Sequence, residues 1–280
     1  MVVAADVAIV GGGVIGLACA YELAHGASLV QDDIIDESDT RHGHPATHKT
    51  YGLLKAILIS DNLLFDIFLE LSKYNTVKIS KRRLSELLRY VGSAAQMAAR
   101  GESFEAALAG NRSVTEEEYL KLAELKTGSL FAGAAASGAV VGGASQRVVD
   151  AMYNFGLSIG VSFQILDDIL DIGGNTSATG KPILKDVQNN ASNLVIIHAL
   201  SRASNYQKQV IESMLWRKWF AISDMKRLTL TLEELGSFVH SNEVAHQYAE
   251  TARRTLRFLP SSEARDKLRR LSYGLEVRRK

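Results

Sequence analysis

The sequence contains little proline, almost no cysteine and almost no net charge. Only 3 of its 280 residues are proline, which leaves room for long helices, because proline inside a helix removes a hydrogen bond and clashes with the preceding turn. The single cysteine, Cys19, excludes an internal disulfide framework and favours a reducing compartment. Lysine plus arginine (32) nearly balances aspartate plus glutamate (31), so no global field exists to attract nucleic acid or an anionic membrane. We therefore expect a cytoplasmic, mainly helical protein with no nucleic-acid partner and no stable membrane insertion.

From residue 50 onward the hydrophobic pattern indicates helices almost throughout. Ser113 with Glu116, and Thr231 with Glu234, have the spacing of capping boxes, in which hydroxyl and carboxylate each satisfy a backbone N–H of the first turn. We expect a buried helix face where apolar residues recur at spacings of three and four, at Leu53, Leu54, Ile57, Leu58, Leu63, Leu64, Ile67 and Phe68.

Strand signals are confined to two short segments, residues 7–10 and 193–197. No alternation of strands and helices follows residue 35, and no fixed-length repeat or low-complexity linker divides the chain. We therefore predict one all-α domain over residues 1–280, with an atypical glycine-rich opening segment at residues 1–17.

Two similar acidic segments carry the clearest chemical signal. The first reads Asp-Asp-Ile-Ile-Asp from Asp32 to Asp36, and the second reads Asp-Asp-Ile-Leu-Asp from Asp167 to Asp171. On a helix the first and last aspartates of each segment share a face, where like charges repel, and the apolar flanks raise the cost of burying them. Carboxylates without histidine or thiolate ligands are typical of a hard cation such as Mg²⁺. Two copies in apolar surroundings favour metal binding over the alternative of two solvated acidic helix faces.

Basic residues accompany both acidic segments. Arg41 follows the first segment, Lys181 follows the second, and Lys126 precedes Thr127 in a stretch of small and apolar residues. Each of these residues alone is more typical of a solvated surface. Beside two magnesium-binding segments they become candidate ligands of a diphosphate, whose charge a metal ion neutralises only in part.

Four segments together resemble the trans-isoprenyl diphosphate synthase (polyprenyl synthetase) family, and in particular its geranylgeranyl diphosphate synthases. The segments are residues 25–36 (His-Gly-Ala-Ser-Leu-Val-Gln-Asp-Asp-Ile-Ile-Asp), 126–131 (Lys-Thr-Gly-Ser-Leu-Phe), 163–171 (Phe-Gln-Ile-Leu-Asp-Asp-Ile-Leu-Asp) and 180–182 (Gly-Lys-Pro). They occur in the family's order, and the resemblance extends from about residue 18 to the end of the chain. It implies a homodimeric, all-α isoprenoid-synthase bundle around a central cavity, lacking its first helices, with the acidic segments facing each other across the mouth.

By this resemblance the chain is a Mg²⁺-dependent prenyltransferase. The family condenses isopentenyl diphosphate with an allylic diphosphate, through an allylic cation that forms as diphosphate departs, and extends the chain to geranylgeranyl diphosphate or beyond. The implied roles are metal binding by Asp32, Asp36 and Asp167, support from the catalytic carboxylates Asp33, Asp168 and Asp171, diphosphate binding by Arg41, Lys126 and Lys181, lining of the site by Thr127 and Gln164, and isopentenyl diphosphate contact by His25.

Product length in this family depends on the bulk of the residues just before the first acidic segment. Here these residues are Ala27 and Ser28, and both are small. An aromatic side chain at this position would close the cavity early. The resemblance therefore implies a product of twenty carbons or more.

The sequence departs from the family pattern at three places, and two of these departures fall on the implied isopentenyl diphosphate site. The Gly-Lys-x-x-Arg-Pro motif expected upstream of His25 is absent, His42 stands where the family has a second arginine, and Asn189 and Asn190 occupy the neighbourhood of a frequent lysine. These departures predict reduced activity. They also leave open a second function, that of a non-catalytic partner subunit of a prenyl synthase.

A third hypothesis comes from the opening glycines. Gly11, Gly13 and Gly16 follow a short apolar segment with the spacing of a dinucleotide-binding loop, and Asp32 stands near the place of the ribose-binding acid. This pattern is typical of an oxidoreductase that binds FAD or NAD. Such a fold needs further parallel strands, which the rest of the sequence does not predict.

Overall fold

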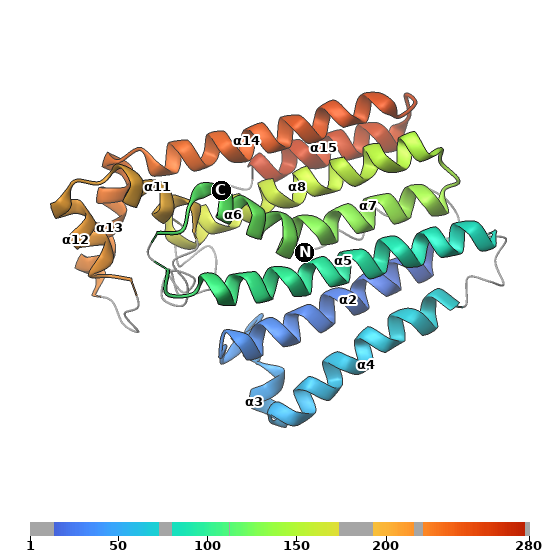
Figure 1. Cartoon of the computed structure of the whole chain (residues 1–280), viewed down its shortest axis with the longest axis horizontal. Coiled ribbons are helices and arrows are strands. Elements are labelled where there is room, and N and C mark those ends of the chain that lie inside the picture. Colours follow the sequence, from blue (N-terminus) through green and yellow to red (C-terminus); the bar gives the residue numbers. More distant parts are fainter. Residues whose placement is uncertain (1–13, 73–79, 112, 174–192, 216–220, 278–280) are drawn as a thin grey trace. The chain divides into compact units, whose positions relative to one another are not determined.

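A computed structural model describes residues 14–72, 80–111, 113–173, 193–215 and 221–277 (Figure 1). Over these residues the chain is helical apart from short connections and two strands of two residues each, β1 (Thr40–Arg41) and β2 (His44–Pro45). This confirms the all-α prediction. The possible strand at residues 7–10 lies outside the described residues.

The contacts divide the chain into two compact units. Unit 1 comprises residues 1–95 and 133–150, and unit 2 comprises residues 96–132 and 151–280. Three helices contribute residues to both units: α5 (Lys81–Leu108), α7 (Ser129–Val141) and α8 (Gln146–Gly173). That the chain forms a single domain stays a prediction.

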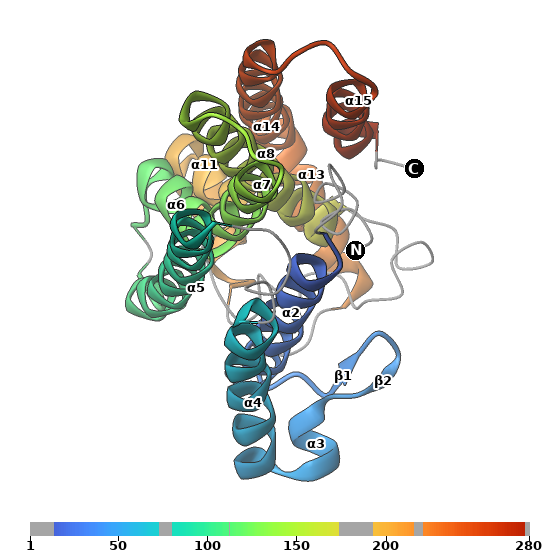
Figure 2. The same cartoon turned by 90° about the vertical axis from the view of Figure 1, so that its right-hand side faces the viewer.

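Unit 1 is built around α2 (Val14–Ile35) and α4 (Leu53–Ser72), which pack side by side (Figure 2). The β1–β2 hairpin and α3 (Thr47–Tyr51) connect them. The hairpin turns at His42 and Gly43, whose φ values of +51° and +79° are those of a tight two-residue turn. The strand register pairs Arg41 with His44, so the turn directs Arg41 back toward the end of α2.

The prediction of a buried apolar face on α4 is wrong for most of its residues. Ile67 is buried as predicted, but the side that packs in the unit is otherwise formed by Ala56, Ser60 and Leu71. Small residues there allow α2 and α4 to approach closely, and the Ser60 hydroxyl donates to the Ala27 carbonyl oxygen at 3.2 Å. Most of the larger apolar side chains of α4 are exposed, whereas Leu63 lies beside Gly26 of α2. In the isolated chain the exposed ones are Leu53, Leu54, Ile57, Leu58, Ile59, Phe65, Phe68 and Leu69.

In unit 2 the short helix α11 (Leu194–Arg202) is packed among several of the remaining helices. Leu194, Val195 and Ile196 of α11 are fully buried and join two hydrophobic clusters, because α6, α12, α13 and α14 surround this helix. The other elements of this unit are α6 (Glu116–Ala123), the π-helix η2 (Glu124–Gly128), α12 (Asn205–Glu212), α13 (Ile222–Glu234), α14 (Ser237–Thr255), the 3₁₀-helix η3 (Leu256–Phe258) and α15 (Glu263–Val277).

The predicted strand at residues 193–197 is instead the start of α11. Asn193 caps this helix, and its side chain accepts a hydrogen bond from the Val195 backbone N–H at 2.9 Å. A short, uniformly apolar run fits a buried strand and a buried helix equally well, so its periodicity could not distinguish them.

Both predicted capping boxes are also misplaced. The cap of α6 is Thr115 with Glu118, two residues beyond the predicted start. Thr231 lies inside α13, where its hydroxyl donates to the Arg227 carbonyl oxygen at 2.8 Å. The sequence spacing alone did not show which hydroxyl begins the helix.

None of the described helices combines the length and apolar character that crossing a bilayer requires.

Candidate functional site

The first acidic segment lies at the C-terminal end of α2 in unit 1. Its middle carboxylate, Asp33, is only 2% exposed, whereas Asp32 is half-buried and Asp36 is exposed. Arg41 of the hairpin donates to Asp33 Oδ1 through Nε at 2.9 Å and Nη2 at 2.6 Å. The guanidinium thus compensates the buried charge and anchors the hairpin to α2. Arg41, which the sequence offers to a diphosphate, is therefore committed in part to Asp33.

About two helical turns before Asp32, α2 carries His25. Burial lowers the pKa of His25. The charge of Glu22 opposes this shift and the charge of Arg41 adds to it, and the imidazole is therefore neutral at pH 7. Its Nε2 is buried and has no hydrogen-bond partner among the described residues. A buried imidazole nitrogen of this kind suits a polar ligand group. Ser28 donates its hydroxyl to the His25 carbonyl oxygen at 2.9 Å.

The second acidic segment lies near the end of α8 in unit 2 and repeats this arrangement. The middle carboxylate, Asp168, is 6% exposed, Asp167 is exposed and Asp171 is half-buried. Tyr119 donates its hydroxyl to Asp168 Oδ2 at 2.6 Å, and Gln164 donates Nε2 to Oδ1 at 2.8 Å. Both carboxylate oxygens of Asp168 are thereby occupied by protein donors.

A hydrogen-bonded chain continues from Asp168 to two other residues of the predicted site. Thr127 donates its hydroxyl to Gln164 Oε1 at 2.6 Å, and Gln164 in turn holds Asp168. Burial, and then the charge of Asp168, raises the pKa of Tyr119 well above its ordinary value, so its hydroxyl remains a donor. The sequence prediction missed Tyr119. Its signal is that a buried tyrosine hydroxyl requires a partner, but the partner itself lies 49 residues away.

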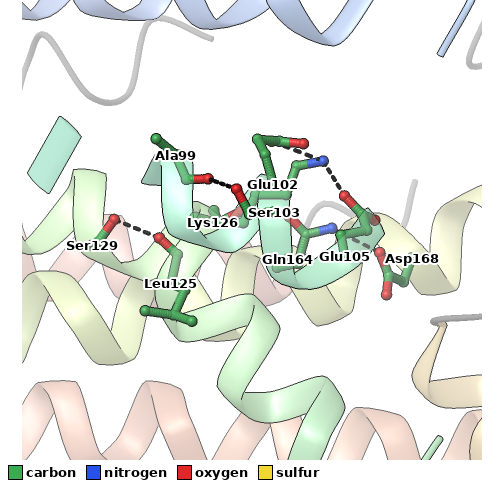
Figure 3. A network of polar contacts seen from close by, with 10 residues as sticks. Ala99, Glu102, Ser103, Glu105, Leu125, Lys126, Ser129, Gln164 and Asp168 are labelled. Atoms are coloured by element: carbon green, nitrogen blue, oxygen red, sulfur yellow. Dashed lines mark hydrogen bonds and ion pairs between the residues drawn. The ribbon is translucent and has the colours of Figure 1, made fainter. Parts of the chain in front are cut away.

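Lys126 lies in the π-helix η2, a rare geometry that is frequent at functional sites. Its Nζ is 3.1 Å from Glu102 Oε1 and 2.6 Å from Glu105 Oε2, both on α5 (Figure 3). The sequence prediction also missed these two glutamates. Their spacing of three residues places them on one helix face, yet nothing in the sequence indicates which cation they contact.

In both acidic segments, then, the protein holds the middle aspartate and the outer ones lie nearer the surface. A pair of outer carboxylates suits a hard cation that takes its other ligands from water and phosphate. Within the described ranges, no three side chains of histidine, cysteine, aspartate or glutamate gather closely enough to hold a metal by themselves. Lys181, Asn189, Asn190 and the glycines Gly11 and Gly13 lie outside the described residues.

Residues 11–231 match the family model for polyprenyl synthetase. The chain belongs to the polyprenyl synthetase family. Among curated relatives, it is 32% identical over 253 residues to geranylfarnesyl diphosphate synthase of Aeropyrum pernix, covering 90% of this chain and 78% of that one. It is 31% identical over 246 residues to geranylgeranyl diphosphate synthase of Saccharolobus solfataricus, covering 88% and 73%. The synthetase therefore groups with prenyltransferases.

Solved structures agree with this assignment. Geranylgeranyl pyrophosphate synthetase of Pyrococcus horikoshii superposes with a TM-score of 0.88 at 30% identity, over 98% of this chain and 84% of that one. A polyprenyl synthase of Caulobacter crescentus, in complex with calcium and isoprenyl diphosphate, gives a TM-score of 0.87 at 28% identity, over 100% and 83%. The family assignment disfavours the FAD- or NAD-binding alternative, and the described residues contain no parallel strands.

Proposed function

We propose that this synthetase condenses isopentenyl diphosphate with an allylic diphosphate in a Mg²⁺-dependent reaction and extends the chain to geranylgeranyl diphosphate or a longer product. The observation that carries the proposal is the shared design of the two acidic segments. In each, the middle aspartate is fixed by protein donors and the outer aspartates lie nearer the surface. The relatives named as geranylgeranyl and geranylfarnesyl diphosphate synthases support the same reaction.

In this proposal Asp32, Asp36 and Asp167 bind Mg²⁺, and Asp171 supports them. Bound Mg²⁺ neutralises charge on the diphosphate and so favours its departure. A partially exposed Lys126 ammonium contacts the departing diphosphate, as does Lys181. Arg41 fixes Asp33 and contacts the diphosphate through its remaining N–H donors. Neutral His25 contacts isopentenyl diphosphate.

Thr127 and Gln164 suit the other half of the reaction, the allylic cation. The Thr127 hydroxyl donates to Gln164 Oε1, and Gln164 Nε2 donates to Asp168. These bonds fix the orientation of both side chains before substrate arrives. Oxygen atoms with fixed dipoles stabilise a developing positive charge without reorganising during the reaction.

Product length provides a test within α2. Ser28 lies one turn before Asp32 on the same helix face, whereas Ala27 is fully buried and its carbonyl faces α4. Ser28→Phe should shorten the product with little change in stability. Ala27→Phe should mainly destabilise unit 1, because its site is already filled. Unchanged product length in Ser28→Phe, measured by chromatography of labelled products, would refute this placement.

The exposed apolar face of α4 supports a homodimer. Leu54 is 71% exposed and Phe65 is 65% exposed, and a contiguous apolar patch on one helix is typical of a protein interface. We propose that a second copy of the chain covers this face. Phe65→Glu should convert the dimer to a monomer in size-exclusion chromatography with light scattering, whereas Val239→Glu, at an exposed apolar residue of α14, should not. A wild-type monomer would contradict the proposal.

The direct experiment is incubation with Mg²⁺, an allylic diphosphate and labelled isopentenyl diphosphate, followed by mass analysis of the products. An elongated prenyl diphosphate, abolished by a chelator and restored by Mg²⁺, is the expected result. Binding of the allylic diphosphate without elongation would favour the alternative of a non-catalytic partner subunit, which the departures at His42, Asn189 and Asn190 keep open.

A further inference from the structure

Lys126 has two carboxylate partners that the proposed reaction does not use. Its Nζ lies 3.1 Å from Glu102 Oε1 and 2.6 Å from Glu105 Oε2 (Figure 3). All three side chains are partly exposed, so the solvent screens them incompletely and substrate can still reach the ammonium. Two carboxylates around one ammonium give this cluster a net negative charge. That is an unexpected balance for a residue proposed to contact an anion.

The main chain of Lys126 packs against the same turn of α5 that its ammonium contacts. Gly101, next to Glu102, packs so closely that a Cβ added there would lie 2.6 Å from the Lys126 backbone nitrogen. One turn of α5, residues 101–105, therefore contacts both the main chain and the ammonium of Lys126. The π-helix η2 places Lys126 against this turn.

We propose that Glu102 and Glu105 are positioning residues, which direct the Lys126 ammonium toward the departing diphosphate and balance its charge until substrate binds. This inference rests on the proposed function. An ammonium on a long, flexible stem loses orientation when a partner is removed, and misorientation slows the chemical step. Removing a nearby negative charge does not weaken the attraction of the site for an anion and can strengthen it. Rate and ground-state binding should therefore respond differently.

The test is the variant Glu105→Gln, which keeps the shape and an acceptor oxygen but removes the charge. We expect kcat for elongation to fall about tenfold, while the Kd for inorganic pyrophosphate with Mg²⁺, measured by calorimetry, is unchanged or lower. Glu102→Gln should behave in the same way. Lys126→Met should instead weaken pyrophosphate binding. The matched control is Glu86→Gln on the same helix, whose partner is the exposed Arg82; both quantities should be unchanged in this control.

Two results would overturn the inference. One is a Glu105→Gln enzyme with wild-type kcat, and the other is a fall in kcat accompanied by weaker pyrophosphate binding, as general damage to the site would give. If wild-type protein makes no elongated product, the proposed function fails. The positioning role is then decided by pyrophosphate binding alone, which must be weaker in Lys126→Met and not in Glu105→Gln.

Discussion

The hydrogen bond between Tyr119 and Asp168 allows the sharpest prediction on stability. The Tyr119 hydroxyl donates to Asp168 Oδ2 at 2.6 Å, and both side chains are buried. Tyr119→Phe removes this donor without creating a cavity, because the ring remains. In the variant, Asp168 Oδ2 loses the hydrogen bond that it accepts from Tyr119 in the wild type.

The expected magnitude follows from the charge of the acceptor. A hydrogen bond to a charged group contributes about 1.5–3 kcal/mol to stability. We therefore expect Tyr119→Phe to lower the free energy of unfolding by about 2–3 kcal/mol at pH 7. For a chain of this size the corresponding fall in Tm is roughly 3–5 °C.

The pH dependence gives this prediction a second, independent readout. Burial and Asp168 raise the pKa of Tyr119, so the folded protein keeps a proton that the unfolded chain releases above pH ~10. The contribution of Tyr119 to stability is complete below that pH and is lost as pH rises, by about 1.4 kcal/mol per pH unit. The stability gap between wild type and Tyr119→Phe should therefore narrow between pH 10 and 11.

Urea unfolding followed by circular dichroism measures both quantities. The control at pH 7 is Tyr248→Phe, because Tyr248 lies half-buried in the same unit and does not contact Asp168; we expect a change within about 0.5 kcal/mol. Tyr119→Phe should also lower the elongation rate, since Asp168 orients Gln164 and, through it, Thr127. A stability loss below 0.5 kcal/mol in Tyr119→Phe, or a gap that stays constant above pH 10, would refute the reasoning.

Two further predictions concern helix packing and a partly buried histidine. A Cβ at Gly160 of α8 would lie 2.7 Å from the Gly128 Cα, so Gly160→Ala should destabilise by more than about 2 kcal/mol, whereas Gly92→Ala, which meets open space within α5, should stabilise by about 0.5–1 kcal/mol. Equal urea midpoints for the two variants would show that the close contact is unimportant. Burial, and then the stacked His240 ring, lowers the pKa of His198, so the unfolded chain binds a proton first as pH falls and stability is lost below about pH 6.5. His198→Phe should flatten the fall in stability between pH 7 and 5, and an unchanged slope would contradict the assignment.

The candidate site residues could be named from the sequence where helical spacing or a family motif marks them, as for the outer aspartates and, by resemblance, Thr127 and Gln164. Their roles in metal and substrate binding stay predictions. The partners Tyr119, Glu102 and Glu105 were missed because each meets its target only through tertiary packing. No periodicity within one helix encodes such a pairing.

The fold shows the same division between local and tertiary information. Scarce proline and the helical pattern predicted the all-α class correctly. The predicted buried face of α4 was wrong for most of its residues, because the small residues Ala56 and Ser60 occupy part of that face and most of the large apolar side chains are exposed. The start of α11 was predicted wrongly, because a short run of buried, mostly β-branched residues also fits a strand.

The dependence of elongation rate on Mg²⁺ concentration tests the central claim most directly. In this account the outer aspartates bind Mg²⁺ and the middle ones are held by protein donors. Asp167→Asn should therefore raise the Mg²⁺ concentration needed for half-maximal rate. Asp168→Asn should lower the maximal rate and the stability and leave that concentration unchanged. Equal shifts in the two variants, or elongation that is indifferent to Mg²⁺, would contradict the account.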